Sequence, residues 1–195
     1  MFLIPFAGRA KRFEDAVMPE EKHVYMTCLY MLKNREDARD GVQETLLRAY
    51  QAYPSFKGQS SVRTWLCRIA SNVCIDMLRK KKETVSFDAL HEKGFDIESK
   101  DKSAQQKMED SEPKESLRHA VFSLPDDMRL IITLRDINGL SYAEVGQILD
   151  LPEGTVKSRI ARARDKLKNI LSENSKNTEL FGEPNVHNSE RRQNK

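Results

Sequence analysis

The segment from Thr155 to Lys168 combines cationic and hydroxyl side chains at helical spacing, a pattern suited to binding nucleic acid. An arginine can donate two hydrogen bonds to the edge of a guanine, and serine or threonine can bond bases or phosphates. The side chains that could do this are Thr155, Lys157, Ser158, Arg159, Arg162, Arg164 and Lys166, followed by Lys168. Asp165 is the one acid among them. The pattern predicts a DNA-binding helix, and the alternative is a solvated basic face on an ordinary surface helix.

The elements around this segment predict how such a helix would be held. Ser141 and Glu144 have the spacing of a capping box, which predicts a helix from Tyr142 to about Leu149. A tight turn at 150–152 then leads into the basic helix. The apolar stripe of that helix consists of Val156, Ile160, Ala163, Leu167 and Ile170. Two helices joined by a tight turn, with a basic amphipathic second helix, predict a helix-turn-helix.

The N-terminal half contains a predicted helix that carries another polar face, in addition to that of the basic helix. Asn34 can cap this helix, the acids at 36 and 37 suit its positive end, and Pro54 ends it. Its polar side carries Asp40, Gln43, Glu44 and Arg48, close to Leu47. By themselves these residues indicate no more than a solvated face.

A third polar face belongs to the helix that follows. Arg68, Asn72, Asp76 and Arg79 recur at helical spacing, on a face expected to differ from that of Trp65, and the basic run 79–82 ends the helix. The apolar stripe consists of Val62, Trp65, Leu66, Ile69, Val73 and Met77. Trp65 is therefore expected to pack in the core; the alternative is a wedge inserted into DNA. The loop at 55–60 before this helix contains Phe56 and is polar otherwise.

These patterns predict an all-α protein with two helical domains and no strands. Residues 20–82 read as three helices, and residues 113–171 as a second helical block. Within that block, the apolar positions from Met128 to Ile137 mark a helix that Asn138-Gly139 should end. Residues 83–112 have no sustained apolar period and a negative net charge, so they are expected to form a flexible polar linker. Residues 1–19 read as an N-terminal extension and residues 172–195 as a disordered tail.

The composition limits the class of protein further. The net charge is only +3, and charged residues make up 32% of the 195 positions, so the distribution of charge has to decide whether nucleic acid is a partner. No apolar run is long enough for a membrane span, and the short apolar start lacks a preceding basic residue, so a cytoplasmic protein without membrane insertion is expected. Cys28, Cys67 and Cys74 lack metal-ligand spacing, and buried reduced thiols are favoured over a redox or metal role.

Four stretches of the sequence resemble a known family. S-Y-A-E-V-G-Q-I-L-D and L-P-E-G-T-V-K-S-R-I-A-R-A-R, at 141–164, resemble region four of sigma factors of the sigma-70 family, in the extracytoplasmic-function (ECF) class. LuxR-type response regulators share a related motif. N-R-E-D-A-R-D-G-V-Q-E-T-L-L-R-A-Y at 34–50 and F-K-G-Q-S-S-V-R-T-W-L-C-R-I-A-S-N-V-C-I-D-M-L-R-K-K-K at 56–82 resemble region two, which response regulators lack.

The resemblance implies a role for each polar face. The helix after Asn34 would bind the clamp helices of the polymerase β′ subunit through Asp40, Gln43, Glu44, Leu47 and Arg48. The next helix and its preceding loop would hold the −10 promoter element as its strands separate, with Phe56 and Asn72 forming a pocket for an unstacked base. The other residues implied there are Lys57, Gln59, Ser60, Ser61, Arg63, Arg68, Asp76, Arg79 and Lys80. The basic helix near the C-terminus would read the −35 element.

The function implied is that of a transcription initiation factor without enzymatic activity or a cofactor. Its partners would be promoter DNA, the β′ clamp helices and β flap of core RNA polymerase, and an anti-sigma factor. The runner-up is a repressor or activator that needs no polymerase. An enzyme is disfavoured, since the sequence shows no Gly-rich phosphate loop, no HExxH and no nucleophile motif. The sequence does not indicate the promoter consensus, the regulon or the inducing signal.

Overall fold

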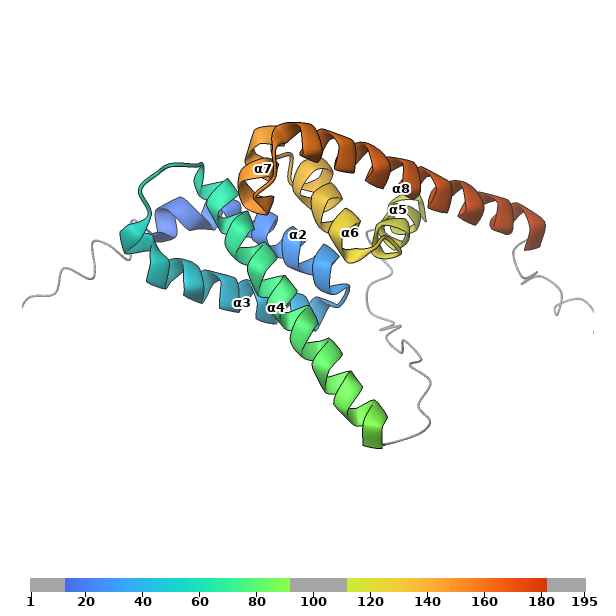
Figure 1. The fold of residues 1–195 in the computed structure, drawn as a ribbon, viewed down its shortest axis with the longest axis horizontal. Coiled ribbons are helices and arrows are strands. Elements are labelled where there is room, and N and C mark those ends of the chain that lie inside the picture. Colours follow the sequence, from blue (N-terminus) through green and yellow to red (C-terminus); the bar gives the residue numbers. More distant parts are fainter. Residues whose placement is uncertain (1–12, 92–111, 182–195) are drawn as a thin grey trace, which may run out of the picture.

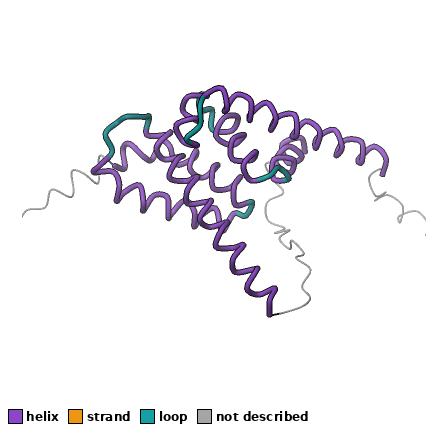
Figure 2. The backbone as a smooth tube through the Cα atoms, in the orientation of Figure 1, coloured by secondary structure: helices purple, strands orange, loops and turns teal. Residues whose placement is uncertain are grey.

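The fold is all-α, as predicted, in a computed structural model that describes residues 13–91 and 112–181. These residues form helices and short connections, with no strand among them (Figures 1 and 2). The predictions for the first part of the N-terminal extension, for 92–111 and for the tail beyond 181 lie outside the described residues. Within the extension, residues 13–17 are helical and Val17 is buried.

The first module is built from α2 (Glu21–Leu32), α3 (Arg35–Ala52) and α4 (Val62–His91), which pack on one another. The side chain of Asn34 accepts hydrogen bonds from the backbone N–H groups of Glu36 and Asp37, so the predicted cap is confirmed. α3 approaches α2 closely at Gly41, where an added Cβ would lie 3.2 Å from the Cys28 sulfur. A glycine at this position therefore sets the spacing of the two helices.

Two helices are longer than the sequence indicated. α4 continues to His91, into the segment predicted as linker, and α8 (Glu153–Phe181) continues ten residues into the segment predicted as a disordered tail. Neither stretch contains glycine or proline until Gly94 and Gly182. Adding residues to an existing helix costs little once the first turn has formed, so polar composition alone did not end these helices.

The second module consists of α5 (Glu112–Phe122), α6 (Asp126–Ile132), a π-helical segment η3 (Thr133–Ile137), α7 (Tyr142–Leu149) and α8. The sequence predicted one regular helix through Ile137, whereas the last turn is wider. The Asn138 N–H bonds the Thr133 carbonyl, five residues back. Gly139 then adopts φ +72°, and so ends the helix as predicted.

The two modules pack against each other. α4 contacts α7, and α2 contacts α5, α6 and η3 (Figure 1). The buried apolar residues of both modules form one continuous cluster. The sequence predicted two domains on a flexible connection and did not predict this contact.

The three cysteines are buried and unpaired, as expected for structural thiols. Burial raises the pKa of Cys67 to about 11, which keeps this thiol protonated and unreactive at neutral pH.

Candidate functional site

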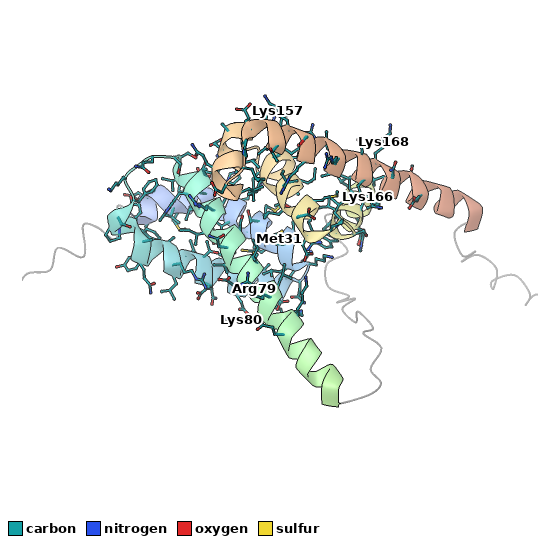
Figure 3. All side chains as sticks on the ribbon, in the orientation of Figure 1. Met31, Arg79, Lys80, Lys157, Lys166 and Lys168 are labelled. Carbon is teal, nitrogen blue, oxygen red and sulfur yellow. The ribbon has the colours of Figure 1, made fainter. Side chains whose placement is uncertain are left out.

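The basic helix α8 is anchored by its apolar stripe. Val156, Ile160 and Ala163 are buried against the second module, while Leu167 and Ile170 are partly buried and pack on the same core. Thr155 is half-buried, and the remaining predicted DNA-contacting side chains are exposed: Lys157, Ser158, Arg159, Arg162, Arg164 and Lys166. Lys157 and Lys168 project outward from α8 (Figure 3). The predicted apolar and polar sides of this helix are therefore confirmed by burial.

The turn before α8 is held rigidly. The Ser141 side chain accepts from the Glu144 N–H at 3.2 Å, and the Glu144 carboxylate accepts from the Ser141 N–H at 2.9 Å, so the predicted capping box is present. An added Cβ on Gly146 would lie 2.7 Å from the Leu151 carbonyl oxygen. This close approach requires glycine and brings α7 directly against the turn. Asp150 ends α7 in the left-handed conformation, at φ 54°.

Arg164 and Lys157, two of the predicted DNA-contacting cations on α8, have partners within the protein. Arg164 donates to both carboxylate oxygens of Asp136, at 3.1 and 2.5 Å, which raises the pKa of Arg164. Lys157 pairs with Glu153 at 2.7 Å, one turn earlier on the same helix. Arg164 therefore ties α8 to η3, a role that the charge pattern of α8 alone could not indicate.

An aromatic cluster lies where the loop 55–60 meets α4. The ring of Phe56 packs on Trp65, with centroids 4.7 Å apart, and stacks beside Tyr53 at 6.4 Å. Phe13, from the N-terminal segment, meets Tyr53 edge-on at 5.2 Å. The sequence pointed to Phe56, and to Trp65 only as the alternative to core packing. Phe13 and Tyr53 were not singled out, because they lie on separate elements.

Trp65 lies at the boundary of the apolar stripe of α4. Its side chain is half-buried and packs against the core, so the expected core packing is confirmed in part. Asn72 follows Trp65 by seven residues, which is about two helical turns, so both point to nearly the same side of α4. The polar face therefore runs beside Trp65. The sequence had suggested that it lies on a separate side of the helix.

Most side chains on the polar face of α4 are exposed, and Arg63 and Asp76 bind neighbouring elements. Arg68, Asn72, Arg79 and Lys80 are exposed (Arg79 and Lys80 in Figure 3), as are Lys57, Gln59 and Ser61 in the loop and helix start; Ser60 is half-buried. Asp76 accepts instead from Arg48 at 3.0 Å, across to α3. Arg63 donates to Glu20 at 2.7 Å. These two pairs connect α4 to neighbouring elements, which spacing along α4 could not reveal.

The polar face of α3 is accessible. Asp40 and Gln43 are exposed, and Leu47 keeps 53% of its surface although it is apolar. Glu44 is bound by Arg48 at 2.7 Å. A groove of about 690 Å³ runs beside this face, lined in part by Met18, Tyr25 and Arg39. Met18, exposed to 62%, was not singled out from the sequence because it precedes the periodic helices.

Comparison with known proteins agrees with this arrangement. Sigma-70 region 2 matches residues 16–84, and sigma-70 region 4 matches residues 114–167. The chain is 36% identical over 170 residues to the ECF RNA polymerase sigma factor SigW of Bacillus subtilis, covering 84% of this chain and 91% of SigW. It is 41% identical over 145 residues to the ECF RNA polymerase sigma-E factor of Escherichia coli K12, covering 68% and 73% of the two chains.

Solved structures show the same fold. The sigma factor RpoE of Bartonella quintana, crystallised in complex with the anti-sigma factor NepR, matches with a TM-score of 0.68 and 25% identity, over 83% of this chain and 98% of RpoE. CnrH, solved in complex with the cytosolic domain of CnrY, matches with a TM-score of 0.63 and 23% identity, over 85% and 91%.

A helix-turn-helix module joined to a region 2 helical module defines a promoter-specificity subunit of bacterial RNA polymerase. The chain belongs to the sigma-70 family as an ECF sigma factor, a non-enzymatic factor for transcription initiation. Within the described residues, no helix is both long and apolar enough to cross a membrane.

Proposed function

We propose that the exposed face of α8 reads the −35 element of the promoters that this factor serves. The observation that carries the proposal is the separation on α8 between Val156, Ile160 and Ala163, which are buried, and the exposed side chains near its N-terminal end. That end of a recognition helix enters the major groove. Ser158, Arg159 and Arg162 are exposed and can face base edges, with Thr155 and Lys157 beside them. Arg164, held by Asp136, and Lys166 lie further along and suit the phosphate backbone.

The loop 55–60 and α4 would hold the −10 element. Single-stranded DNA binds where cations follow the backbone and aromatic rings stack on bases. Phe56 on Trp65 supplies a supported ring, and the exposed Arg68, Asn72 and Arg79 continue along the same side of α4. Lys57, Gln59, Ser60, Ser61 and Lys80 flank them. Arg63 and Asp76, which are paired within the protein, would act by positioning their neighbours.

The face of α3 would bind core polymerase. Asp40, Gln43 and the exposed Leu47 offer a mixed polar and apolar surface of the kind that protein interfaces use, with Glu44 and Arg48 paired behind them. Its partner would be the β′ clamp helices, while the second module would meet the β flap. In this proposal, residues 20–82 form the region 2 domain and residues 113–171 the region 4 domain, with residues 83–112 as the linker. The factor would act in the cytoplasm.

An anti-sigma factor is a further proposed partner. Support comes from the Bartonella quintana sigma factor, which is 25% identical to this chain and was crystallised with an anti-sigma factor. This chain would be controlled in the same manner, by a protein that covers the module surfaces which polymerase or promoter would otherwise occupy.

The test is run-off transcription with core polymerase, the purified chain and a promoter selected with the holoenzyme. We expect a discrete run-off product that requires both core and chain. The matched control is the chain with Asp40→Lys, which should bind the same promoter duplex through α8 but support little transcription. Sequence-specific binding by the chain with no stimulation of core polymerase would favour a repressor or activator that acts without polymerase.

A further inference from the structure

The start of the described chain is fastened to the aromatic cluster beside the proposed −10 site. Residues 13–17 are helical, and Val17 is 3% exposed. The ring of Phe13 meets Tyr50 edge-on at 5.3 Å and Tyr53 edge-on at 5.2 Å, at the end of α3 and just beyond it. Aromatic rings attract one another in this geometry. Phe13 therefore fixes where the chain that precedes it enters the first module.

Phe13 is also close to the ring that is proposed to stack on an unpaired base. The Tyr53 ring contacts both, with its centroid 5.2 Å from that of Phe13 and 6.4 Å from that of Phe56. The centroids of Phe13 and Phe56 are thus no further apart than these two distances together. Trp65 packs on Phe56 at 4.7 Å and completes the cluster. The N-terminal segment consequently enters the module at the edge of the proposed −10 site.

Three cations stand directly before this anchor in the sequence: Arg9, Lys11 and Arg12. Their placement lies outside the described residues, but the chain itself limits their distance from Phe13. Consecutive Cα atoms are about 3.8 Å apart, so the Cα atoms of Arg12 and Lys11 lie within about 4 and 8 Å of the Phe13 Cα. A lysine or arginine side chain extends this reach further. The phosphates beside a base stacked on Phe56 are therefore accessible to these cations.

The charges near Phe13 are divided in a way that suits a DNA strand. Glu14 and Asp15, both exposed, follow Phe13 in the first turn of the helical segment, where the positive end of a helix favours acids. Elsewhere around the aromatic cluster, Lys57 and Arg68 supply exposed cations. A groove that binds single-stranded DNA combines cations along the backbone with rings that stack on the bases. The three N-terminal cations would extend this combination on the Phe13 side of the cluster.

We propose that the three cations at residues 9–12 belong to the −10 site, where they bind the phosphodiester backbone of the unpaired strand beside the base held by Phe56. Phe13 is the positioning residue that keeps them there. The proposal rests on the function proposed above for this site. Phosphate contacts fix a strand in place but do not read its bases. The segment therefore contributes to the stability and the salt dependence of the open complex, and leaves the choice of promoter sequence to other residues.

The test is the affinity of holoenzyme, formed from core polymerase and the full chain, for a promoter fragment unpaired across the −10 element, measured over a range of salt concentrations. The cation variant carries Arg9→Gln, Lys11→Gln and Arg12→Gln. The matched control removes the same charge from the other end of the chain, with Arg191→Gln, Arg192→Gln and Lys195→Gln. Phe13→Ala removes the anchor, and Phe13→Tyr retains the ring. Thermal unfolding followed by circular dichroism checks that each variant folds.

Each phosphate contact on a single strand contributes about 0.7 to the slope of log affinity against log salt concentration, so the cation variant should reduce the steepness of this slope by up to about 2. Phe13→Ala should reduce it in the same direction, and adding Phe13→Ala to the cation variant should change the slope no further. Phe13→Tyr and the control should keep the slope of the unaltered chain. Lower affinity of Phe13→Ala at an unchanged slope, an unchanged slope in the cation variant, or an equal loss in the control would each overturn the proposal.

Phe56→Ala separates this proposal from the function on which it rests. If Phe56→Ala leaves the affinity for the unpaired fragment unchanged, the −10 site itself is misplaced and the proposal falls with it. If Phe56→Ala weakens binding while the cation variant keeps the full slope, the −10 site stands and the N-terminal cations are not part of it.

Discussion

The guanidinium of Arg164 on α8 binds both carboxylate oxygens of Asp136 on η3, so a basic side chain of the proposed DNA-reading helix is used to hold that helix in place. Both side chains keep substantial exposure, 49% and 32%, and an exposed pair of this kind contributes about 0.2–1 kcal/mol. We predict a coupling energy of this size in a double-mutant cycle of Arg164→Ala and Asp136→Ala, measured by chemical denaturation. A coupling near zero would leave Arg164 as a DNA contact alone.

Arg162 is exposed and forms no ion pair with a carboxylate among the residues the structure describes. It is therefore expected to read bases. A bidentate contact to a base is worth roughly 1–3 kcal/mol of discrimination, whereas a phosphate contact contributes evenly across sequences and increases the salt dependence. Arg162→Ala should therefore relax sequence preference within the −35 element, and Lys168→Ala should weaken binding evenly. Selection of −35 sequences from a randomised pool by each holoenzyme measures both. Unchanged preference in the Arg162→Ala holoenzyme would assign this residue to the backbone.

Phe56 and Asn72 should act in strand opening more than in duplex binding. Stacking of a base on an aromatic ring is worth about 1–3 kcal/mol, and Phe56 is supported from behind by Trp65. Phe56→Ala and Asn72→Ala should each reduce open complexes on duplex promoters, as measured by permanganate reactivity. A template already unpaired across the −10 element serves as the control, on which much of the defect should disappear. Normal opening of the duplex by both variants would mean that the pocket lies elsewhere.

The exposed face of α3 should determine affinity for core polymerase. Asp40→Lys reverses an exposed charge that forms no ion pair with the residues the structure describes, whereas Glu44→Lys also breaks the pair with Arg48. We expect both substitutions to weaken core binding in a pull-down at physiological salt, with helicity unchanged for Asp40→Lys. Retention of full affinity for core polymerase by a variant that carries both Asp40→Lys and Glu44→Lys would contradict the assignment of this face.

Glu144 should make stability sensitive to acid. Hydrogen bonds from the Ser141 N–H and the Thr64 hydroxyl lower the pKa of Glu144 below its usual 4.5. Because its pKa is lower in the folded than in the unfolded chain, its contribution to stability is complete above about pH 4.5 and is lost as the pH falls below that value. Glu144→Gln should therefore lower stability at pH 7 and reduce the loss between pH 5 and 3.5. Denaturant midpoints across this range provide the comparison, and parallel pH profiles for both proteins would refute the role.

The sequence was sufficient where the signal is local. The Asn34 cap, the Ser141–Glu144 capping box, the stop at Gly139 and the buried stripe of α8 each depend on residues within a few positions of one another, and the structure confirms them. The helix ends at His91 and Phe181 were missed because they depend on propagation from a formed helix, which polar composition does not reveal.

Contacts between distant residues could not be predicted in the same way. Arg129 reads as an ordinary surface cation on a short helix, yet it is 1% exposed and reaches the Met31 carbonyl, 98 positions earlier in the chain. The pairing of Arg48 with Asp76 and of Arg63 with Glu20 likewise removes side chains from faces that spacing alone assigns to DNA or polymerase. Which side chains pair across two helices depends on how those helices pack. A single sequence does not show such pairing as a periodic pattern.

The most direct test of the central claim is transcription in vitro from a library of random DNA fragments, with core polymerase alone, with the chain, and with the chain carrying Phe56→Ala and Arg162→Ala together. Sequencing of the 5′ ends of the transcripts identifies the start sites. We predict that the chain creates a set of starts preceded by shared −10 and −35 sequences, that core alone does not produce them, and that the double variant largely loses them. The same starts with and without the chain would contradict its assignment as the subunit that selects promoters.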